Sequence, residues 1–482
     1  MGAINERQTV INSRKIWSGA RILVFLHSFF VYIDIIMIEK FTVENYRSYR
    51  KEETLSFVAS NKEKGSELPP QWYKEIDGKR ILHLLLCVGL NGTGKSKMFN
   101  ALNYLRMIVV SKPKNPTDKP DFRPFLLDDE SRQKPTVLSL TYYVEDTCFL
   151  YRVAVSAERI EEEELRLVAG NVPVFNRSYN ADKDTVTIKY GSGCDLSKAD
   201  QRMLDANVIQ NATVMSVYGG LNLGSKVLRS NFNFFVSHVS SVKRSEQSLA
   251  DRLMTGDAER DKRVKTLLLK LLKDVGTNIV DYEVDGTSVL IADLVNQGAP
   301  DIIIKAMQSQ YPSGVISHKN LRFIHSTAHA GKISLDSGLE SFGTMNIIRL
   351  LVVMYDIVMG RKTSTIDEID AGIHTKALMF ILKMYLSIAE DSQVAIATHD
   401  LSFLAFSGLR RDAVRMFDKD EDGNSYIKKH EYVHNTLNFQ KYYLKSLGTK
   451  LDELMDDMEL FQEYSDMAKT FLAELSDEKS VK

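Results

Sequence analysis

A glycine-rich stretch, GLNGTGKS at residues 89–96, has the residue types and spacing of a phosphate-binding loop. Its glycines allow successive backbone amides to close around phosphate oxygens, and a helix that begins at its end adds a partial positive charge. Lys95 would place a point charge on the β- and γ-phosphates, and the hydroxyl of Ser96 would be a ligand of Mg²⁺. The stretch therefore predicts a nucleotide site, with a flexible loop that holds no ligand as the alternative.

Two adjacent carboxylates follow a short strand pattern in TSTIDEID, residues 363–370. Asp367 could complete the coordination of Mg²⁺, and Glu368 could polarise a water molecule for attack on a phosphate. Acidic pairs are common at the solvated ends of strands, so the pair by itself is weak grounds for a site. Whether the acidic pair belongs to a phosphate site depends on where its strand ends in the sheet.

A histidine ends another buried-strand pattern, VAIATHD at residues 394–400. His399 lies 31 positions after Glu368, and a helical pattern separates the two strands. In a parallel strand–helix–strand unit both strands end at the same edge of the sheet, beside the phosphates of a bound nucleotide. A lone histidine is more often structural, but its combination with the loop and the acidic pair favours a role at the phosphates.

Small and hydroxyl-bearing residues stand at the head of a long apolar helix pattern, in ESFGT at residues 340–344. The amides at a helix N-terminus bind anions, so this segment could form a second phosphate contact. Taken alone it would be an ordinary helix cap. Its place directly before the acidic strand favours the second interpretation.

The elements that must hold these groups follow from the pattern of apolar residues. Residues 37–58 have the β-branched and aromatic composition of two paired strands. Residues 81–89 form a continuous apolar run that suits a strand buried on both faces. Residues 96–109 have helical spacing. The glycine-rich loop is therefore expected at a strand–loop–helix junction, which a phosphate-binding loop requires.

The rest of the chain mixes strands and helices. Alternating segments at 135–144 and 148–156 predict an antiparallel hairpin, and the charge-rich 160–167 predicts an exposed strand or helix edge. From about 195 to 275 the pattern is mainly helical, and Gly276 is the expected stop. We find no internal repeat and no low-complexity tract.

Composition narrows the class of protein. The chain has 482 residues, of which 44% are hydrophobic and 26% charged, as in a soluble globular protein with a sizeable core. The formal net charge of −1 does not demand a nucleic acid or an anionic membrane as partner. Cys87, Cys148 and Cys194 have neither metal-site nor disulfide-framework spacing, which favours a reducing cytoplasm.

Residues 21–38 and the run from Asp418 look like a membrane segment and a calcium loop, respectively, but each departs from that pattern. Residues 21–38 are apolar, but His27 and Asp34 interrupt them, so a membrane span or signal peptide is less favoured than an upstream extension at 1–36 outside the fold. Asp418 begins a run that imitates a calcium loop. The twelfth position, however, is Lys429 in place of the required glutamate, so we expect a hairpin turn there.

The motifs together resemble the SMC/RecF-like branch of ABC-type ATPases, and within it the stand-alone bacterial ATPases related to the OLD family and to abortive-infection proteins. The resemblance spans about 37–435. It rests on IEKFTVENYRSY, GLNGTGKS, ESFGT, IDEIDAGIH with His374, and THDLSFL, with NRSYNAD and LRRDAVRMFDKDEDG in support. The signature ESFGT departs from the LSGGQ of transporters.

The resemblance implies an α/β fold: a P-loop ABC-type ATPase head with a mixed sheet core, an antiparallel β subdomain and a mainly helical insertion. The implied domains are an extension at 1–36, ATPase lobes at 37–155 and 331–435, an insertion at 156–330 and an acidic helical segment at 436–482. Nucleotide-binding residues would be Gly89, Asn91, Gly92, Gly94, Lys95 and Ser96. Ser96 and Asp367 would hold Mg²⁺, Glu368 would be the general base, and His399 would sense the γ-phosphate. Ser341, Gly343 and Thr344 would act in trans.

By the same resemblance, the protein would bind ATP and Mg²⁺ and hydrolyse ATP slowly. It would work as a homodimer, or as a larger homo-oligomer built from head-to-tail dimers, in the cytoplasm and without a membrane. Its expected role is that of a switch in bacterial defence against phage or other foreign DNA, acting with a separately encoded effector. The alternatives are a DNA repair or chromosome-maintenance ATPase, which would contact DNA, and a scaffold that binds ATP without hydrolysing it.

Overall fold

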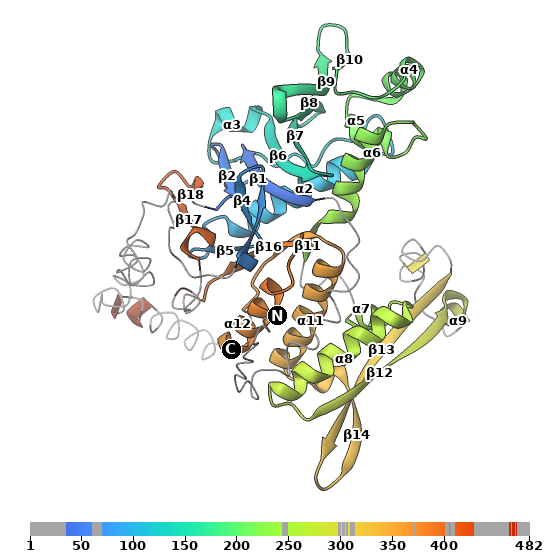
Figure 1. The fold of residues 1–482 in the computed structure, drawn as a ribbon, viewed down its shortest axis with the longest axis vertical. Coiled ribbons are helices and arrows are strands. Elements are labelled where there is room, and N and C mark those ends of the chain that lie inside the picture. The colour runs from blue at the N-terminus through green and yellow to red at the C-terminus, as the bar shows by residue number, and fades with distance from the viewer. Residues whose placement is uncertain are drawn as a thin grey trace, which may run out of the picture.

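A computed structural model describes most of the chain (Figure 1). The described residues are 35–59, 70–242, 249–296, 300, 304, 307–308, 314–370, 372–400, 404, 410–428, 462–463, 465–467 and 469. The expected extension at 1–36 lies outside them except for its last two residues, and so does most of the acidic segment at 436–482.

The centre of the molecule is a six-stranded sheet in the order β11-β15-β16-β5-β17-β18. Its first five strands run parallel, and β18 runs antiparallel to β17. The strands are β5 (Leu84–Val88), β11 (Val239–Val242), β15 (Thr363–Ile366), β16 (Gln393–Thr398), β17 (Val414–Lys419) and β18 (Ser425–Ile427). Every residue of β5 and β16 is buried, as central strands of a parallel sheet must be. The expected strand at 81–89 is divided at His83, since β4 (Lys79–Leu82) ends there.

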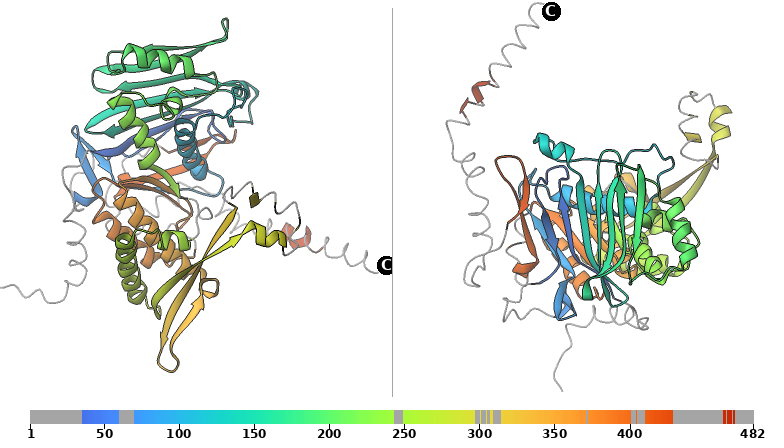
Figure 2. Two further views of the ribbon diagram at one scale, coloured as in Figure 1. Left: turned by 90° about the vertical axis from the view of Figure 1, so that its right-hand side faces the viewer. Right: turned by 90° about the horizontal axis from the view of Figure 1, so that it is seen from above.

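Three helices flank this sheet: α2 (Lys95–Val110), α11 (Phe342–Met359) and α12 (Thr375–Leu386). The expected helix after the glycine-rich loop is confirmed as α2, and α12 is the crossover between the parallel strands β15 and β16. In Figures 1 and 2, α11 and α12 lie on one side of the sheet, while α2 and the second sheet lie on the other. The core sheet is therefore covered on both faces.

The second sheet is antiparallel and has seven strands in the order β10-β9-β8-β7-β6-β1-β2. They are β1 (Ile36–Glu44), β2 (Glu53–Ser56), β6 (Thr136–Val144), β7 (Thr147–Val155), β8 (Ile160–Leu167), β9 (Val172–Asn180) and β10 (Thr185–Tyr190). The pairing of β1 with β2 confirms the expected strand pair at 37–58, and the pairing of β6 with β7 confirms the expected antiparallel hairpin. The expected domain boundary at 155/156 falls between β7 and β8, which are hydrogen-bonded neighbours.

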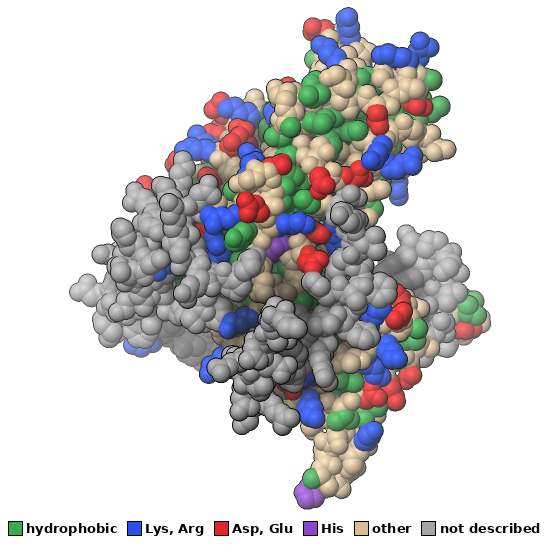
Figure 3. Space-filling model, viewed as in Figure 1, with side chains coloured by type: hydrophobic (Ala, Val, Ile, Leu, Met, Phe, Trp, Pro, Cys, Tyr) green, Lys and Arg blue, Asp and Glu red, His purple; other side chains and the backbone are tan. Residues whose placement is uncertain are grey.

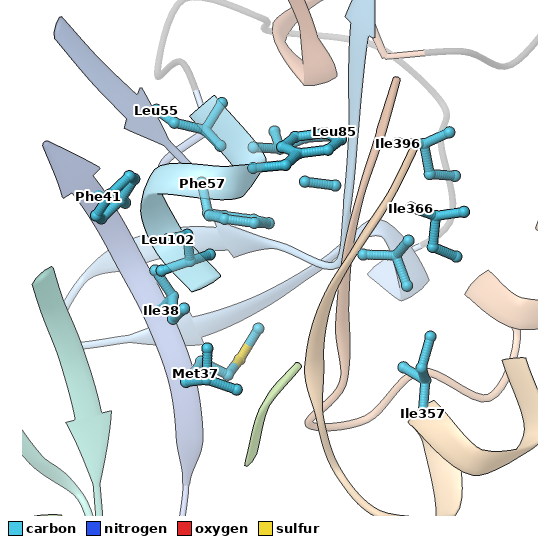
Figure 4. Close-up of a cluster of buried hydrophobic side chains, with 14 of the residues drawn as sticks. Met37, Ile38, Phe41, Leu55, Phe57, Leu85, Leu102, Ile357, Ile366 and Ile396 are labelled. Carbon is cyan, nitrogen blue, oxygen red and sulfur yellow. The ribbon is translucent and has the colours of Figure 1, made fainter. Parts of the chain in front are cut away.

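The two sheets share one hydrophobic core. Figure 4 shows side chains of the second sheet, of α2 and of the central strand β5 gathered together, among them Met37, Ile38, Phe41, Leu85 and Leu102. A buried amide also joins the sheets. Gln393 on β16 accepts from Ile38 N at 2.6 Å and from Thr363 Oγ1 at 2.9 Å. Its Nε2 donates to Ile38 O at 2.9 Å and to Leu82 O at 3.1 Å, so the whole side-chain amide is satisfied.

The remaining elements lie at the edges of these two layers. A three-stranded sheet, β12-β13-β14, reaches away from the body (Figures 1 and 2). The expected helical stop is confirmed, since α8 ends just before Gly276, whose φ is +88°. The elements are β3 (Tyr73–Ile76), β12 (Ile279–Leu290), β13 (Val315–Thr327), β14 (Gly331–Asp336), α3 (Asp129–Gln133), α4 (Lys198–Asn207), α5 (Val214–Tyr218), α6 (Lys226–Asn233), α7 (Leu249–Leu253), α8 (Ala258–Asp274) and α9 (Ile291–Asn296).

One helix among the described residues, α11, is long and apolar enough to cross a membrane. Half of that stretch is buried inside the molecule. The helix packs against α8 and α12. Its apolar character is therefore accounted for by its place in the core.

The charge-rich segment at 160–167 is not the exposed edge that its composition predicts. It forms β8, which has β7 and β9 as neighbours in the antiparallel sheet, and Glu163 is only 1% exposed. Glu163 accepts hydrogen bonds from Tyr151 Oη at 2.9 Å and from Val214 N at 2.6 Å. The buried guanidinium of Arg177 donates to the carbonyl of Gln210 at 2.8 Å. These partners fasten the start of α5 to the sheet, which explains how the charges are tolerated.

Burial of Glu163 makes stability depend on pH. Burial raises the pKa of this carboxyl from 4.5 to about 7, although hydrogen bonds from Val214 and the charge of Arg177 oppose the shift. A raised pKa in the folded state favours the protonated form, so the stabilisation is complete below pH 4.5 and is lost as the pH rises through about 7. We expect a loss of about 3 kcal/mol in the free energy of unfolding across that window, measured by urea denaturation. The free energy of unfolding of Glu163→Gln should fall much less across the same window. If the pH dependence of that variant equals that of the unchanged protein, Glu163 is not its source.

Candidate functional site

The parallel pairing of three strands brings the predicted chemical groups to one edge. Thr398, the last residue of β16, pairs with Val88, the last residue of β5. Ile366, the last residue of β15, pairs with Ile396 of β16. The glycine-rich loop, the acidic pair and His399 each follow one of these strands, so they leave the sheet at the same edge.

The glycine-rich loop closes against its neighbours so tightly that two of its glycines have no room for a side chain. A Cβ on Gly89 would lie 2.5 Å from the carbonyl oxygen of Phe417. A Cβ on Gly94 would lie 2.5 Å from Ser425 Oγ, and φ is +103° at this position. Tyr49 Oη also donates to Gly94 O at 2.9 Å. Gly94 is the N-cap of α2 and makes no side-chain cap, so the first amides of the helix are open to an anion.

The ammonium group of Lys95 lies inside the loop. Its Nζ donates to Gly89 O at 2.7 Å and to Leu90 O at 2.9 Å. His399 Nδ1 lies 3.5 Å from the same nitrogen and 3.2 Å from Gly89 O. Burial lowers the pKa of Lys95, and the charge of Asp367 is the largest influence that opposes this shift. Lys95 and His399 therefore meet inside the loop, and the charge of Asp367 acts on the same ammonium group.

The acidic pair splits into two environments. Asp367 is half-buried and acts electrostatically on Lys95, whereas Glu368 is exposed. Glu368 also has a left-handed backbone, with φ of +51°. Such a conformation is uncommon for a residue other than glycine and is typical of functional sites. Two adjacent carboxylates thus face different surroundings, as two separate roles would require.

Asp370 holds the end of β15 to the end of β16, and the sequence interpretation gave it no role of its own. Its Oδ2 accepts from Thr398 Oγ1 at 2.9 Å and from Asp400 N at 3.1 Å. Asp400 in turn accepts from Thr375 Oγ1 at 2.7 Å, at the start of α12. His399 lies between the two residues that this network fixes. The third acid of IDEID was the signal in the sequence that pointed to it.

The ESFGT segment lies at the head of α11, as expected. Ser341 is the N-cap, and its Oγ accepts from Thr344 N at 3.1 Å. Gly343 is needed for close approach, because a Cβ there would lie 2.5 Å from the carbonyl oxygen of Gly372. Among the described residues, no hydrogen bond joins Ser341, Gly343 or Thr344 to the glycine-rich loop of the same chain. Within one chain, these three residues therefore make no hydrogen-bonded contact with the glycine-rich loop in the described ranges.

His374 and the run that begins at Asp418, both singled out in the sequence, have structural roles. His374 is exposed and caps α12, since its Nδ1 accepts from Lys376 N at 3.2 Å. The run that imitates a calcium loop forms the turn between β17 and β18, with φ of +80° at Gly423. This confirms the expected hairpin turn.

The site fits Mg²⁺ only together with a bound phosphate. No group of three or more His, Cys, Asp or Glu side chains placed for a metal ion occurs in the part of the chain that the structure describes. Mg²⁺ commonly takes one or two protein oxygens and completes its shell with phosphates and water. A hydroxyl at Ser96, the second residue of α2, and a carboxylate at Asp367 form a donor set of that kind.

Comparisons with known proteins give no family for this chain. No family model and no curated protein matches the sequence. Among solved structures, an SMC head domain from Thermotoga maritima has 13% identity and a TM-score of 0.35, over 82% of this chain and 99% of that one. An Smc head domain bound to the C-terminal domain of ScpA, derived from Pyrococcus furiosus, has 10% identity and a TM-score of 0.36, over 88% and 100%. Likenesses at this level of identity and TM-score assign no function to the chain.

Asp370 should act by positioning its neighbours. We expect Asp370→Ala to leave the chain folded and able to bind a nucleoside triphosphate, while turnover falls roughly 10- to 100-fold, because His399 loses its fixed place. The measurement is steady-state turnover beside equilibrium binding of the nucleotide. Asp182→Ala, at an exposed turn, is the control and should change neither value. Equal losses of binding and turnover in Asp370→Ala would mean that the residue only stabilises the fold.

Proposed function

We propose that this protein binds and hydrolyses ATP as a dimeric switch. One observation carries the proposal. Three parallel strands, β5, β15 and β16, end at one edge of the sheet. The glycine-rich loop, the acidic pair and His399 follow them there, and His399 Nδ1 lies 3.5 Å from the ammonium nitrogen of Lys95. A loop, a metal-binding carboxylate, a base and a phosphate sensor are the parts that ATP hydrolysis needs.

ATP binding follows from the geometry of the loop. The β- and γ-phosphates would take the place of the two carbonyl oxygens that Lys95 now contacts. The amides from Gly92 to Ser96 would donate to the phosphates, with the N-terminus of α2 behind them. Ser96 and Asp367 would hold Mg²⁺, which supplies charge neutralisation to the phosphates when bound. Gly89, Asn91 and Gly94 shape the loop.

Hydrolysis needs a base and a group at the γ-phosphate. Glu368, exposed beyond the end of β15, orients the attacking water and accepts its proton. His399 lies 3.5 Å from the ammonium nitrogen of Lys95, so a γ-phosphate bound by Lys95 would lie within its reach. Asp370 joins the loop that carries Glu368 to the end of β16, where His399 follows.

A second copy of the chain would complete the site. Ser341, Gly343 and Thr344 would meet the γ-phosphate of the partner in a head-to-tail dimer. Their surroundings support this: Leu339 is 72% exposed and Phe342 58% exposed, and an interface would bury both. ATP then closes the dimer, and hydrolysis opens it.

The region at 156–330 would transmit the change of state. His325 on β13 lies 2.6 Å, through Nε2, from Glu340 Oε1, and its Nδ1 lies 2.8 Å from Asn278 Oδ1. Glu340 directly precedes Ser341. A shift at the head of α11 would therefore act on the ribbon of β12, β13 and β14 through a direct contact.

The role that we propose for this switch is defence against phage or other foreign DNA in the cytoplasm, with a separately encoded effector. It is supported by the resemblance of the motifs in the sequence. The face in Figure 3 carries interspersed acidic and basic side chains, in keeping with the net charge of −1 and with a protein partner. A direct role on DNA would show as salt-dependent DNA binding by the purified protein.

The acidic pair separates binding from chemistry. We expect Glu368→Gln to bind ATP but to lose about 10²–10⁴-fold in turnover, since it keeps the shape of the side chain and removes the base. The variant should accumulate as a closed, ATP-loaded dimer. Asp367→Asn should also weaken Mg²⁺-dependent binding. Steady-state ATPase activity and light scattering with ATP measure both effects, and wild-type turnover in Glu368→Gln would remove that residue from the mechanism.

The role of Ser341 in trans has its own test. Ser341→Arg should leave ATP binding by the monomer nearly unchanged and should abolish ATP-dependent dimer formation, because a bulky cation replaces the hydroxyl that meets the partner's phosphate. Loss of the helix cap costs about 1 kcal/mol, which the fold should tolerate. Ser178→Arg, on the exposed side of β9, adds the same charge and should still dimerise. If Ser341→Arg loses ATP binding by the monomer as well as dimer formation, ESFGT is only a structural cap.

A further inference from the structure

A cavity of about 580 Å³ lies along the second half of α2, on the stretch from Asn100 to Ser111. Its other walls are the turn after β1, the loop at 112–123, the start of β8 and Asn211. Small-molecule sites have volumes of about 300–1,000 Å³. Since a helix rises about 1.5 Å per residue, Tyr104 stands roughly 13 Å beyond Lys95 along the axis. None of the residues 89–96 lines the cavity, so it is separate from the phosphate-binding loop.

Three residues that line this cavity have a buried polar atom without a hydrogen-bond partner within the described part of the chain. The atoms are Tyr104 Oη, Asn211 Oδ1 and Arg47 Nε. Tyr104 is 9% exposed and Asn211 5% exposed. Nearly all buried polar groups in folded proteins have a partner. Three unpartnered atoms around one cavity therefore indicate a ligand that satisfies them.

The orientation of the Asn211 amide is fixed by its surroundings. Its Nδ2 donates to Asn115 O at 3.0 Å and to Asp118 O at 2.6 Å. The reverse orientation would place an oxygen against two carbonyl oxygens, so the unpartnered atom is an acceptor. Burial raises the pKa of Tyr104, so its hydroxyl stays protonated and can donate. The ligand must therefore offer both a hydrogen-bond donor and an acceptor.

The charges at the cavity favour an anion. Both carboxylates that line it are already engaged: Asp121 accepts from Arg123 at 2.7 Å, and Asp118 accepts from Asn115 N at 2.8 Å. Lys119 is also paired, with Glu158 at 2.8 Å.

Two lining cations remain, Arg47 and Lys112, and neither has a carboxylate partner in the described ranges. The Arg47 guanidinium lies 5.5 Å from the centre of the Tyr46 ring, which stacks on Tyr104 at 5.8 Å. Together with Met107 and Ile108, the two rings give the cavity an apolar wall beside its cationic side. This combination suits a molecule that has an anionic group and a ring.

We propose that this cavity binds a small phosphate-bearing molecule of the nucleoside monophosphate class. Its phosphate pairs with Arg47 and Lys112, a sugar hydroxyl or base amino group donates to Asn211 Oδ1, and Tyr104 Oη donates to an oxygen or ring nitrogen. The rings of Tyr46 and Tyr104 contact its apolar face. Because the cavity lies on α2, a ligand there touches the helix whose first two residues are Lys95 and Ser96.

The test uses the full chain with Lys95→Ala, which removes the main phosphate contact of the other site. Isothermal titration with AMP should show one saturable site, and ribose 5-phosphate and inorganic phosphate should bind more weakly. Tyr104→Phe and Lys112→Ala, each added to Lys95→Ala, should weaken AMP binding about tenfold or more. Tyr104→Phe removes only a hydroxyl that has no partner among the described residues, so if Tyr104 serves only the fold, the variant should lose neither stability nor AMP binding. Tyr179→Phe, on β9, is the matched control and should bind as before.

Three results would overturn the proposal: no saturable AMP binding by Lys95→Ala, AMP binding that neither Tyr104→Phe nor Lys112→Ala weakens, or inorganic phosphate binding as tightly as AMP. ATP turnover by the otherwise unchanged chain is measured separately. Failure of this second site is therefore distinguishable from failure of the proposed ATPase.

Discussion

The parallel register of β5, β16 and β15 is the constraint on which the site depends. Side chains alternate between the faces of a strand, so a slip of one residue would turn every buried side chain of β16 to the other face. It would also move His399 along the edge relative to the glycine-rich loop. Gln393 prevents such a slip at the other end of β16, because its amide is bonded to Ile38, Leu82 and Thr363. A slip would leave that buried amide without partners, which costs more than the bonds themselves contribute.

Buried polar side chains elsewhere in the molecule also hold neighbouring elements together by hydrogen bonds. Glu163 and Arg177 fasten the start of α5 to the antiparallel sheet, and Asp370 fastens the loop after β15 to the end of β16. Each of these carboxylates accepts at least two hydrogen bonds within the protein. Tyr104 and Asn211 differ from these carboxylates, because each has one buried atom without a partner in the described part of the chain and lines an open cavity. The satisfied carboxylates thus hold elements together, whereas the unpartnered atoms of Tyr104 and Asn211 carry the proposal of a ligand at the cavity.

Much of the fold and of the candidate site could be predicted because the signals are local. The glycine-rich loop, the start of α2, the cap at Ser341 and the turn at Gly423 each depend on residues within one helical turn or one tight turn. The β6–β7 hairpin shows in the alternation of adjacent residues. The position of His399 and the acidic pair at one edge of the sheet could be predicted because the strands of a parallel strand–helix–strand unit end at the same edge.

The amino-acid sequence by itself determined which residues are candidates for binding phosphate and metal, and which local elements carry them. Tertiary structure alone decided that Glu163, in a run of acids that looks solvated, lies buried inside a sheet, because burial depends on which strands pair on either side. It also decided that β11 joins the core sheet beside β15, more than a hundred residues later, and that Asn211 meets α2 and the loop at 112–123 at one cavity. Contacts over such distances depend on the packing of whole layers, which no short stretch of sequence encodes.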